Sequence, residues 1–263
     1  MCYLVFCISL FVTVSIKKGI DIDKLCMLSV SHLTFQYPQS KTKVLIDLSF
    51  SIEQSEIFGF LGPSGSGKST TQQILYKQLT SFEGDVEIGG KPIQNWSRDF
   101  FQKIGVCFEL PNHYLKLTAR ENLSYFSAFY EGETGGIEEW LDKVGLLPDA
   151  DKRVSEFSKG MKVRLNFVRA LIHRPELLFL DEPTSGLDPV NAKIIKDLIR
   201  EEQQKGTTIF LTTHNMYDAD QLCDRVALLH EGKMVAQDSP GHLKLQHGKP
   251  TVSVTSDTGS QST

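Results

Sequence analysis

The chain has 263 residues, enough for one large domain or for a core with a small subdomain. Hydrophobic residues make up 40% of it and charged residues 23%, which is ordinary for a soluble globular protein. The formal net charge of −4 argues against a general nucleic-acid binder, because such proteins are usually basic. The five cysteines are scattered without a CxxC pair, which indicates reduced thiols in a cytosolic protein.

The N-terminal stretch is uncharged and mostly apolar over its first sixteen residues, and two lysines follow it. A signal peptide would carry its positive charge before the apolar run. A helix over this run would span about 24 Å, against about 30 Å for the hydrocarbon core of a bilayer; a tilted anchor is the alternative. We expect residues 1–26 to be an upstream extension, with Met27 as the start of the domain.

Short strands are expected next, over Leu28–Phe35, Val44–Ile52 and Glu56–Leu61. A strand pair follows around Gly84–Ile88 and Lys91–Ile93, and residues 110–160 favour a helical subdomain.

The C-terminal half alternates strands with helices. Leu177–Leu180 is apolar throughout, as a central parallel strand should be. Asp188 is a predicted helix cap, and the core face of its helix is assigned to Val190, Ile194, Leu198 and Ile199. The strand Thr208–Thr213 follows. The pattern predicts an α/β fold over residues 28–245 with a mostly parallel sheet, an N-terminal antiparallel β subdomain and a polar tail over residues 249–263.

The sequence Gly62-Pro63-Ser64-Gly65-Ser66-Gly67-Lys68-Ser69 is a phosphate-binding loop of the GxxxxGK[ST] type. It lies between a predicted buried strand and a predicted helix that begins at Thr70. The glycines allow backbone N–H groups to point at anionic oxygens, and the helix N-terminus adds its positive dipole end. We expect Lys68 to reach the β- and γ-phosphates and Ser69 to ligate Mg²⁺. These residues predict a P-loop NTPase core that binds a nucleoside triphosphate.

A pair of carboxylates, Asp181 and Glu182, follows the apolar strand Leu177–Leu180. Ligands of open α/β sheets bind at the carboxyl ends of the strands, so this position suits a metal and a reacting water. We expect Asp181 to hold Mg²⁺, usually through water, and Glu182 to act as general base. A lone Asp-Glu pair would more often begin a solvated loop, and the phosphate loop is what favours the catalytic interpretation.

The stretch Phe157-Ser158-Lys159-Gly160-Met161 resembles the signature of the ATP-binding cassette (ABC) family, usually written LSGGQ. Phe157 replaces the Leu, Lys159 the first Gly and Met161 the Gln, a form similar to that of exporter ATPases encoded apart from their membrane subunits. Ser158 is a predicted helix cap, and Gly160 permits close backbone approach, which makes a second anion site. The resemblance implies that Ser158 and Gly160 close on the γ-phosphate held by the opposite subunit.

The remaining family landmarks follow in order, so that the resemblance covers about residues 28–240. Ser185-Gly186-Leu187-Asp188 resembles the D-loop, which links the two active sites of a dimer. His214 resembles the switch histidine that contacts the γ-phosphate and orients Glu182 and water. Tyr37 resembles the aromatic residue that stacks on adenine, and Phe35 is the competing candidate.

One position departs from the family pattern. The family places a Gln after the strand Ile104–Phe108, where it ligates Mg²⁺ and senses the membrane subunit, and this chain has Glu109 there. A carboxylate can still ligate Mg²⁺, and its charge should disfavour binding of the phosphates without the metal. We therefore expect retained hydrolysis with a steeper Mg²⁺ requirement.

The resemblance implies an ATP-hydrolysing subunit of an ABC transporter, with ATP and Mg²⁺ as cofactors. Separate membrane permease subunits would carry the substrate, and the protein would lie at the cytoplasmic face of the membrane through them. Two copies, or this chain and a similar one, would sandwich two ATP molecules. A groove for the permease is expected within Pro111–Tyr130, where the apolar candidates are Leu115, Leu117, Tyr125, Phe126, Phe129 and Tyr130. The alternative is a soluble ABC ATPase that acts on ribosomes or DNA.

Overall fold

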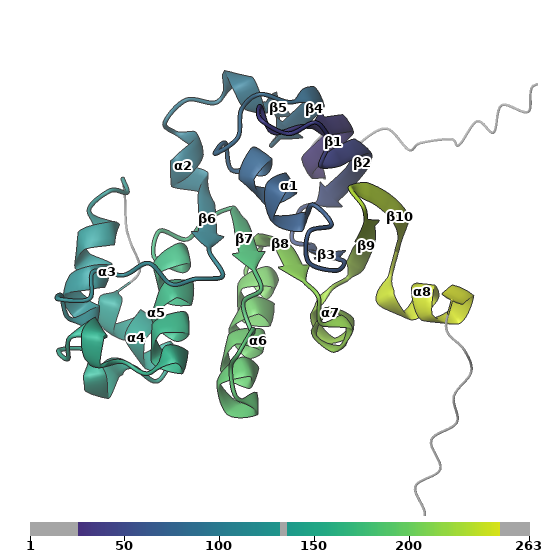
Figure 1. The fold of residues 1–263 in the computed structure, drawn as a ribbon. Coiled ribbons are helices and arrows are strands. Elements are labelled where there is room, and N and C mark those ends of the chain that lie inside the picture. The colour runs from purple at the N-terminus through teal and green to yellow at the C-terminus, as the bar shows by residue number, and fades with distance from the viewer. Residues whose placement is uncertain (1–25, 132–135, 248–263) are drawn as a thin grey trace, which may run out of the picture.

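The computed structural model describes residues 26–131 and 136–247, arranged as a mixed α/β fold (Figure 1). The larger of its two sheets has six strands in the order β10-β9-β3-β8-β7-β6. These strands are β3 (Ile57–Leu61), β6 (Ile104–Cys107), β7 (Leu177–Asp181), β8 (Thr208–Thr213), β9 (Arg225–His230) and β10 (Lys233–Asp238). Every neighbouring pair is parallel except β9 and β10. The predicted mostly parallel sheet is confirmed.

The smaller sheet is antiparallel and has the order β2-β1-β4-β5. Its strands are β1 (Cys26–Phe35), β2 (Leu45–Glu53), β4 (Glu83–Ile88) and β5 (Lys91–Pro92). The predicted strand over Lys91–Ile93 is one residue too long, because Ile93 already begins a 3₁₀ turn. Apart from Cys26 in β1, the predicted extension lies outside the described residues, as does the predicted tail.

Eight α-helices complete the described part of the chain. They are α1 (Lys68–Leu75), α2 (Phe100–Lys103), α3 (Ala119–Ser127), α4 (Ile137–Lys143), α5 (Lys159–Leu171), α6 (Pro189–Gln204), α7 (Met216–Leu222) and α8 (Pro240–His247). Helices α3, α4 and α5 form a group at the left of Figure 1, beside the edge strand β6. This group corresponds to the helical subdomain predicted from the sequence. Within the described residues, no helix combines the length and the apolarity needed to cross a bilayer.

The six-stranded sheet is covered on both faces because its side chains alternate. Phe58, Phe179 and Phe210 point to the face covered by α1 and the antiparallel sheet, where Phe50 of β2 stacks on Phe58 at 5.6 Å between ring centroids. Their neighbours in β3, β7 and β8 point to the opposite face, against α5, α6 and α7. Burial on both sides explains why the central strands are apolar throughout.

The core face of α6 differs from the prediction at two residues. Val190 is 71% exposed, whereas Ile195 is fully buried together with Ile199. Since 3.6 residues make one helical turn, a face that contains Leu198 and Ile199 also contains Ile195, and Val190 lies outside it in the first turn.

The parallel register brings the carboxyl ends of three strands to one edge. Leu61 of β3 pairs with Thr213 of β8, and Asp181 of β7 pairs with Thr212 of β8. The loops that leave this edge carry the phosphate loop, the carboxylate pair and His214, at the place where open α/β sheets bind ligands.

Candidate active site

The predicted phosphate loop joins β3 to α1 and depends on its glycines. Gly65 and Gly67 have φ angles of +79° and +108°, which side-chain-bearing residues rarely adopt. Gly62 lies against the carbonyl oxygen of Leu229 in β9, so that a side chain would collide with backbone. Helix α1 begins at Lys68, and its N-cap Gly67 supplies no side-chain acceptor. The first amide groups of α1 therefore remain available to an anion.

The side chain of Lys68 turns back toward the phosphate loop. Its ammonium group donates hydrogen bonds to the carbonyl oxygens of Gly62, at 2.7 Å, and of Pro63, at 3.0 Å. The residue is only 8% exposed. Within the same loop, the buried hydroxyl of Ser66 has no hydrogen-bond partner among the described residues. The loop thus contains a cation and an unpaired hydroxyl group, and both are suited to the oxygens of a phosphate chain.

Asp181 ends β7 beside the phosphate loop. The hydroxyl of Ser69 lies 3.5 Å from one of its carboxylate oxygens, and Thr212 of β8 donates to the same oxygen. No three His, Cys, Asp or Glu side chains converge as a metal site in the described parts of the chain. The oxygens of Ser69 and Asp181 fit Mg²⁺ as two protein ligands, because this ion commonly takes its other ligands from substrate phosphates and water.

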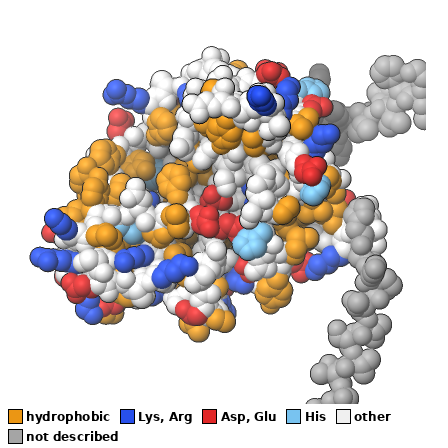
Figure 2. Space-filling model, in the orientation of Figure 1, with side chains coloured by type: hydrophobic (Ala, Val, Ile, Leu, Met, Phe, Trp, Pro, Cys, Tyr) orange, Lys and Arg blue, Asp and Glu red, His pale blue; other side chains and the backbone are white. Residues whose placement is uncertain are grey.

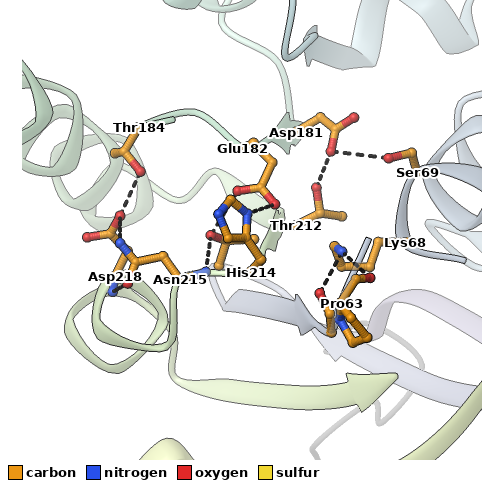
Figure 3. A network of polar contacts seen from close by, with 12 residues as sticks. Pro63, Lys68, Ser69, Asp181, Glu182, Thr184, Thr212, His214, Asn215 and Asp218 are labelled. Atoms are coloured by element: carbon orange, nitrogen blue, oxygen red, sulfur yellow. Dashed lines mark hydrogen bonds and ion pairs between the residues drawn. The ribbon is translucent and has the colours of Figure 1, made fainter. Parts of the chain in front are cut away.

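Glu182 is held by three contacts in an uncommon backbone conformation. Its φ angle is +49°, and its amide donates to the carbonyl oxygen of Thr212 at 3.0 Å. Its side chain is 12% exposed, accepts a hydrogen bond from Thr213 at 3.1 Å, and lies 2.8 Å from Nδ1 of His214 (Figure 3). Left-handed backbone at a glutamate is strained and persists where the surroundings fix it. The carboxylate is consequently fixed in direction at the edge of the sheet.

His214 follows β8 directly and lies opposite Glu182 in Figure 3. An ionised carboxylate can only accept, so the 2.8 Å contact assigns the proton to Nδ1 and leaves Nε2 free. The side chain is 62% exposed. Next along the chain, Asn215 caps α7 by accepting from the amide groups of Tyr217 and Asp218. The cap fixes where the histidine loop ends, so that His214 can reach both Glu182 and solvent.

Most of the predicted site residues line one cavity of about 390 Å³. Its lining includes Ser64, Gly65, Gly67, Lys68, Ser69, Thr70, Glu109, Asp181, Glu182 and His214. Figure 2 shows acidic side chains and a histidine gathered in the middle of this face. A phosphate-binding loop, a Mg²⁺-compatible oxygen pair and a fixed carboxylate–histidine pair therefore meet around one space.

The two predicted adenine-stacking candidates differ in exposure. Tyr37 is 37% exposed, and its hydroxyl lies 3.3 Å from that of Thr70, at the edge of the phosphate loop. Phe35 is 4% exposed and packs edge-on against Tyr37 at 4.9 Å between centroids. Of the two, only Tyr37 presents a ring surface to a ligand.

The signature residues lie at a second place, the N-terminus of α5. Ser158 is its N-cap and accepts from the amide of Met161 at 3.2 Å, as the sequence predicts. Gly160 faces Asn191 and Leu187, and the Lys159 side chain lies across Gly186. Neither Ser158 nor Gly160 lines the cavity around Lys68. The structure thus leaves the signature apart from the phosphate loop of its own chain.

Glu109 lies in a segment that is tied to α5. Asn166 donates to the carbonyl oxygen of Phe108 at 2.8 Å, and Nε2 of His113 lies 2.9 Å from the carbonyl oxygen of Lys162. Burial lowers the pKa of His113 to about 4, so this imidazole is neutral and donates from Nε2. Glu109 also lines a neighbouring groove of about 860 Å³, together with Phe101, Tyr114, Phe126 and Tyr130. It therefore lies between the nucleotide cavity and an aromatic groove.

Sequence reasoning missed the side chains that hold Asp181 and Glu182 and their loop in place. Thr212 and Thr213 bind Asp181 and Glu182, and the two consecutive threonines at the end of a strand were a usable signal. Asp218 accepts a hydrogen bond from Thr184 at 2.7 Å, and its burial, which marks it as more than a surface carboxylate, is seen only in the structure.

Comparisons with known proteins agree with this geometry. The family model described as "ABC transporter" matches residues 45–185. A fluoroquinolones export ATP-binding protein of Mycobacterium tuberculosis is 50% identical over 228 residues, which cover 87% of this chain and 76% of that protein. The chain belongs to the ABC transporter family. It is an ATP-binding and ATP-hydrolysing transporter subunit with the mixed α/β fold of ABC ATPases.

Other ABC proteins extend the comparison. The bacitracin transport ATP-binding protein BcrA of Bacillus licheniformis is 38% identical, over 85% of this chain and 73% of its own length. Among solved structures, an ATP-binding subunit of an ABC transporter superposes with a TM-score of 0.76 at 28% identity, covering 84% of this chain and 93% of that one. A dimeric ATP-binding cassette, MJ0796, bound to ADP and Pi after hydrolysis, superposes at 0.73 with 26% identity, over 81% of this chain and 99% of its own.

Proposed function

We propose that this ABC ATPase powers export through separate permease subunits, by closing as a dimer on ATP and Mg²⁺. The observation that carries the proposal is the convergence of Lys68, Ser69, Asp181, Glu182 and His214 around one cavity. The relatives named for export handle chemically different compounds, fluoroquinolones and Nod factors. The direction of transport is what these names share, and we infer export for this chain while leaving the choice of substrate to the permease.

In the proposed reaction, the phosphate loop binds the triphosphate and the sheet edge supplies the base. Lys68 exchanges its bonds to loop carbonyls for bonds to the β- and γ-phosphates. Glu182 takes a proton from the attacking water, and the N–H at Nδ1 of His214 keeps the carboxylate in position. Nε2 would donate to the γ-phosphate when it also carries a proton, because phosphate oxygens only accept. Bound Mg²⁺ would neutralise charge on the phosphates, with Ser69, Asp181 and Glu109 as its ligands. Tyr37 would stack on the adenine ring.

The second half of the site comes from another subunit. Ser158 and Gly160 do not line the cavity of their own chain, so their anion site must serve a nucleotide held elsewhere. A second copy, or a similar cassette, supplies that nucleotide when two subunits face each other. The dimeric state of the MJ0796 cassette supports this arrangement.

The permease would bind the aromatic groove beside Glu109. Large hydrophobic side chains that line it are exposed, among them Phe101, Phe108, Leu110 and Tyr114. Figure 2 shows hydrophobic side chains gathered at the left of this face, over α2 and α3. Such a patch beside the active site is suited to a partner that responds to ATP. Binding there would place the subunit at the cytoplasmic face of the membrane, as a peripheral protein.

Replacement of the general base tests the proposal. Glu182→Gln keeps the shape of the side chain but cannot accept a proton, so Mg-ATP should accumulate in a closed dimer. We expect size exclusion to show a dimer only with Mg-ATP, and phosphate release to stop. Glu87→Gln, on an exposed strand position, is the control and should hydrolyse ATP like the wild type. Unimpaired hydrolysis by Glu182→Gln would contradict the assignment of the base.

A further inference from the structure

Asp218 is a buried carboxylate on α7 that the proposed reaction does not use. It is 7% exposed and does not line the nucleotide cavity. Three groups donate to it: the hydroxyl of Thr184 at 2.7 Å, the ammonium of Lys196 at 2.9 Å and the side-chain amide of Asn215 at 3.0 Å. Its charge is therefore compensated by one cation and two further donors, as a buried carboxylate requires.

Two of these donors lie next to Glu182 and His214 in the chain. Thr184 lies two residues after Glu182, in a turn closed by a bond from the amide of Ser185 to the carbonyl oxygen of Glu182 at 3.0 Å. Asn215 lies directly after His214, and its backbone N–H donates to the hydroxyl of Thr213 at 3.0 Å.

The contacts close into a ring. Thr213 donates to the Glu182 carboxylate at 3.1 Å, so the path from Glu182 through Thr184, Asp218 and Asn215 returns to Glu182 (Figure 3). A closed ring restrains two loops relative to each other more strongly than separate bonds would.

The ring acts where the backbone is strained. Glu182 has a φ angle of +49°, a conformation that persists only if surrounding contacts fix it. The Thr184–Asp218 bond fixes the chain on one side of Glu182, and the bond from the Glu182 amide to Thr212 fixes it directly. Lys196 links the ring to α6 and also donates to Gln221 at 2.8 Å. Three elements, the loop after β7, α6 and α7, thus meet at one carboxylate.

We propose that Asp218 is a positioning residue, which holds Glu182 and His214 in register so that base and switch histidine act on the same γ-phosphate. The inference rests on the proposed function, because it assumes the roles given to Glu182 and His214. Asp218 does not line the cavity that would hold the nucleotide. Its loss should therefore lower kcat and leave the KM for ATP nearly unchanged.

The test compares Asp218→Asn with Thr184→Val in the full chain. Thr184→Val removes one hydroxyl at nearly constant volume, so it serves even if Asp218→Asn folds poorly. We expect kcat for ATP to fall about tenfold or more in each, because small displacements of catalytic groups are costly, with KM within about twofold of the wild type. Asp197→Asn is the matched control on α6: Asp197 pairs with the exposed Lys193, and the variant should retain kcat.

Two further readouts separate positioning from simple stabilisation. The double variant should lose no more kcat than the worse single variant, because both substitutions break the same ring. Hydrogen exchange should quicken together in the segments around Glu182 and His214. The inference is overturned if both single variants match Asp197→Asn in kcat, if their effects add, or if exchange changes around α7 alone. If Glu182→Gln hydrolyses ATP normally, the proposed catalytic roles fail instead.

Discussion

Two helix N-termini of this protein are suited to anions, and they are prepared differently. At α1, the cap residue Gly67 offers no side-chain acceptor, and Lys68 is turned into the loop. At α5, Ser158 caps its own helix, and Lys159 lies exposed across Gly186. The sheet edge places Asp181 and Glu182 beside the first terminus, in a cavity that Ser158 and Gly160 of the second terminus do not line.

The difference shows how the parts of one nucleotide site can be divided between two termini that need not meet within one chain. At the α1 terminus the phosphate loop lies beside the predicted metal ligand and general base, because three strand ends converge there. At the α5 terminus the cap is satisfied internally by Ser158, and under the proposed function this terminus meets a nucleotide only when another subunit presents one. We expect the two termini to respond differently to substitution.

Lys68→Ala should give the largest effect and break the α1 site alone. Lys68 is expected to bond to two phosphates, and each charged hydrogen bond contributes about 1.5–3 kcal/mol, so ATP affinity should fall about 100-fold or more. Titration calorimetry measures it. Lys43→Ala is the control: this exposed lysine pairs with Glu83 at 3.6 Å, and its loss should leave affinity unchanged. Equal affinities for both variants would contradict the α1 assignment.

His113 should make the attachment of α5 sensitive to acid. Burial lowers the pKa of His113 from 6.5 to about 4, so between these values the unfolded chain binds the extra proton and the folded chain does not. The contribution to stability is complete above pH 6.5 and is lost as the pH falls toward 4. At pH 5 the loss of stability amounts to about 2 kcal/mol.

The check is urea unfolding at pH 7 and pH 5. The wild type should lose about 2 kcal/mol more than His113→Gln over this interval, because the variant has no imidazole to protonate. His230→Gln, at an exposed position of β9, should lose as much as the wild type. An identical loss in all three proteins would show that His113 is not the group involved.

Ser158→Ala separates the role of Ser158 as a helix cap from its proposed role at the partner's nucleotide. Loss of the cap costs about 1 kcal/mol of stability. If Ser158 also serves a nucleotide on the partner subunit, ATP turnover should fall about tenfold while binding to the monomer is retained. Thr118→Ala is a matched control, because Thr118 caps α3 in a capping box with Glu121 and belongs to the same helical subdomain. It should lose stability but keep turnover.

Glu109→Gln should give the smallest effect. Glu109 lines the cavity around Lys68, where its charge opposes phosphates that lack a metal. The variant should bind ATP in EDTA about threefold more tightly, and its ATPase should saturate at lower Mg²⁺. An unchanged Mg²⁺ titration, equal to that of Glu87→Gln, would refute the steeper metal requirement.

The sequence predicted the parts of the fold and site that follow local rules. The apolar run Leu177–Leu180 identified a buried strand, and the loop from Gly62 to Ser69 identified a helix start, because each is set by neighbouring residues. The convergence of these loops followed from parallel strand order.

What could not be predicted depends on contacts between distant segments. The ring through Thr184, Asp218 and Asn215 joins residues whose spacing has no period, and the burial of Ile195 in place of Val190 depends on how α6 is rotated against the sheet. The domain limits 28–245 and the role of each site residue stay predictions.

The left-handed backbone at Gly186 has a consequence for how such chains diverge. Its φ angle of +68° disfavours any side chain there, whereas the Lys159 ammonium that lies across it is the end of a flexible side chain and can move aside. Position 186 should therefore stay glycine over evolutionary time, while position 159 tolerates other residues. A collection of natural relatives can be examined for this difference, without reference to any transported compound.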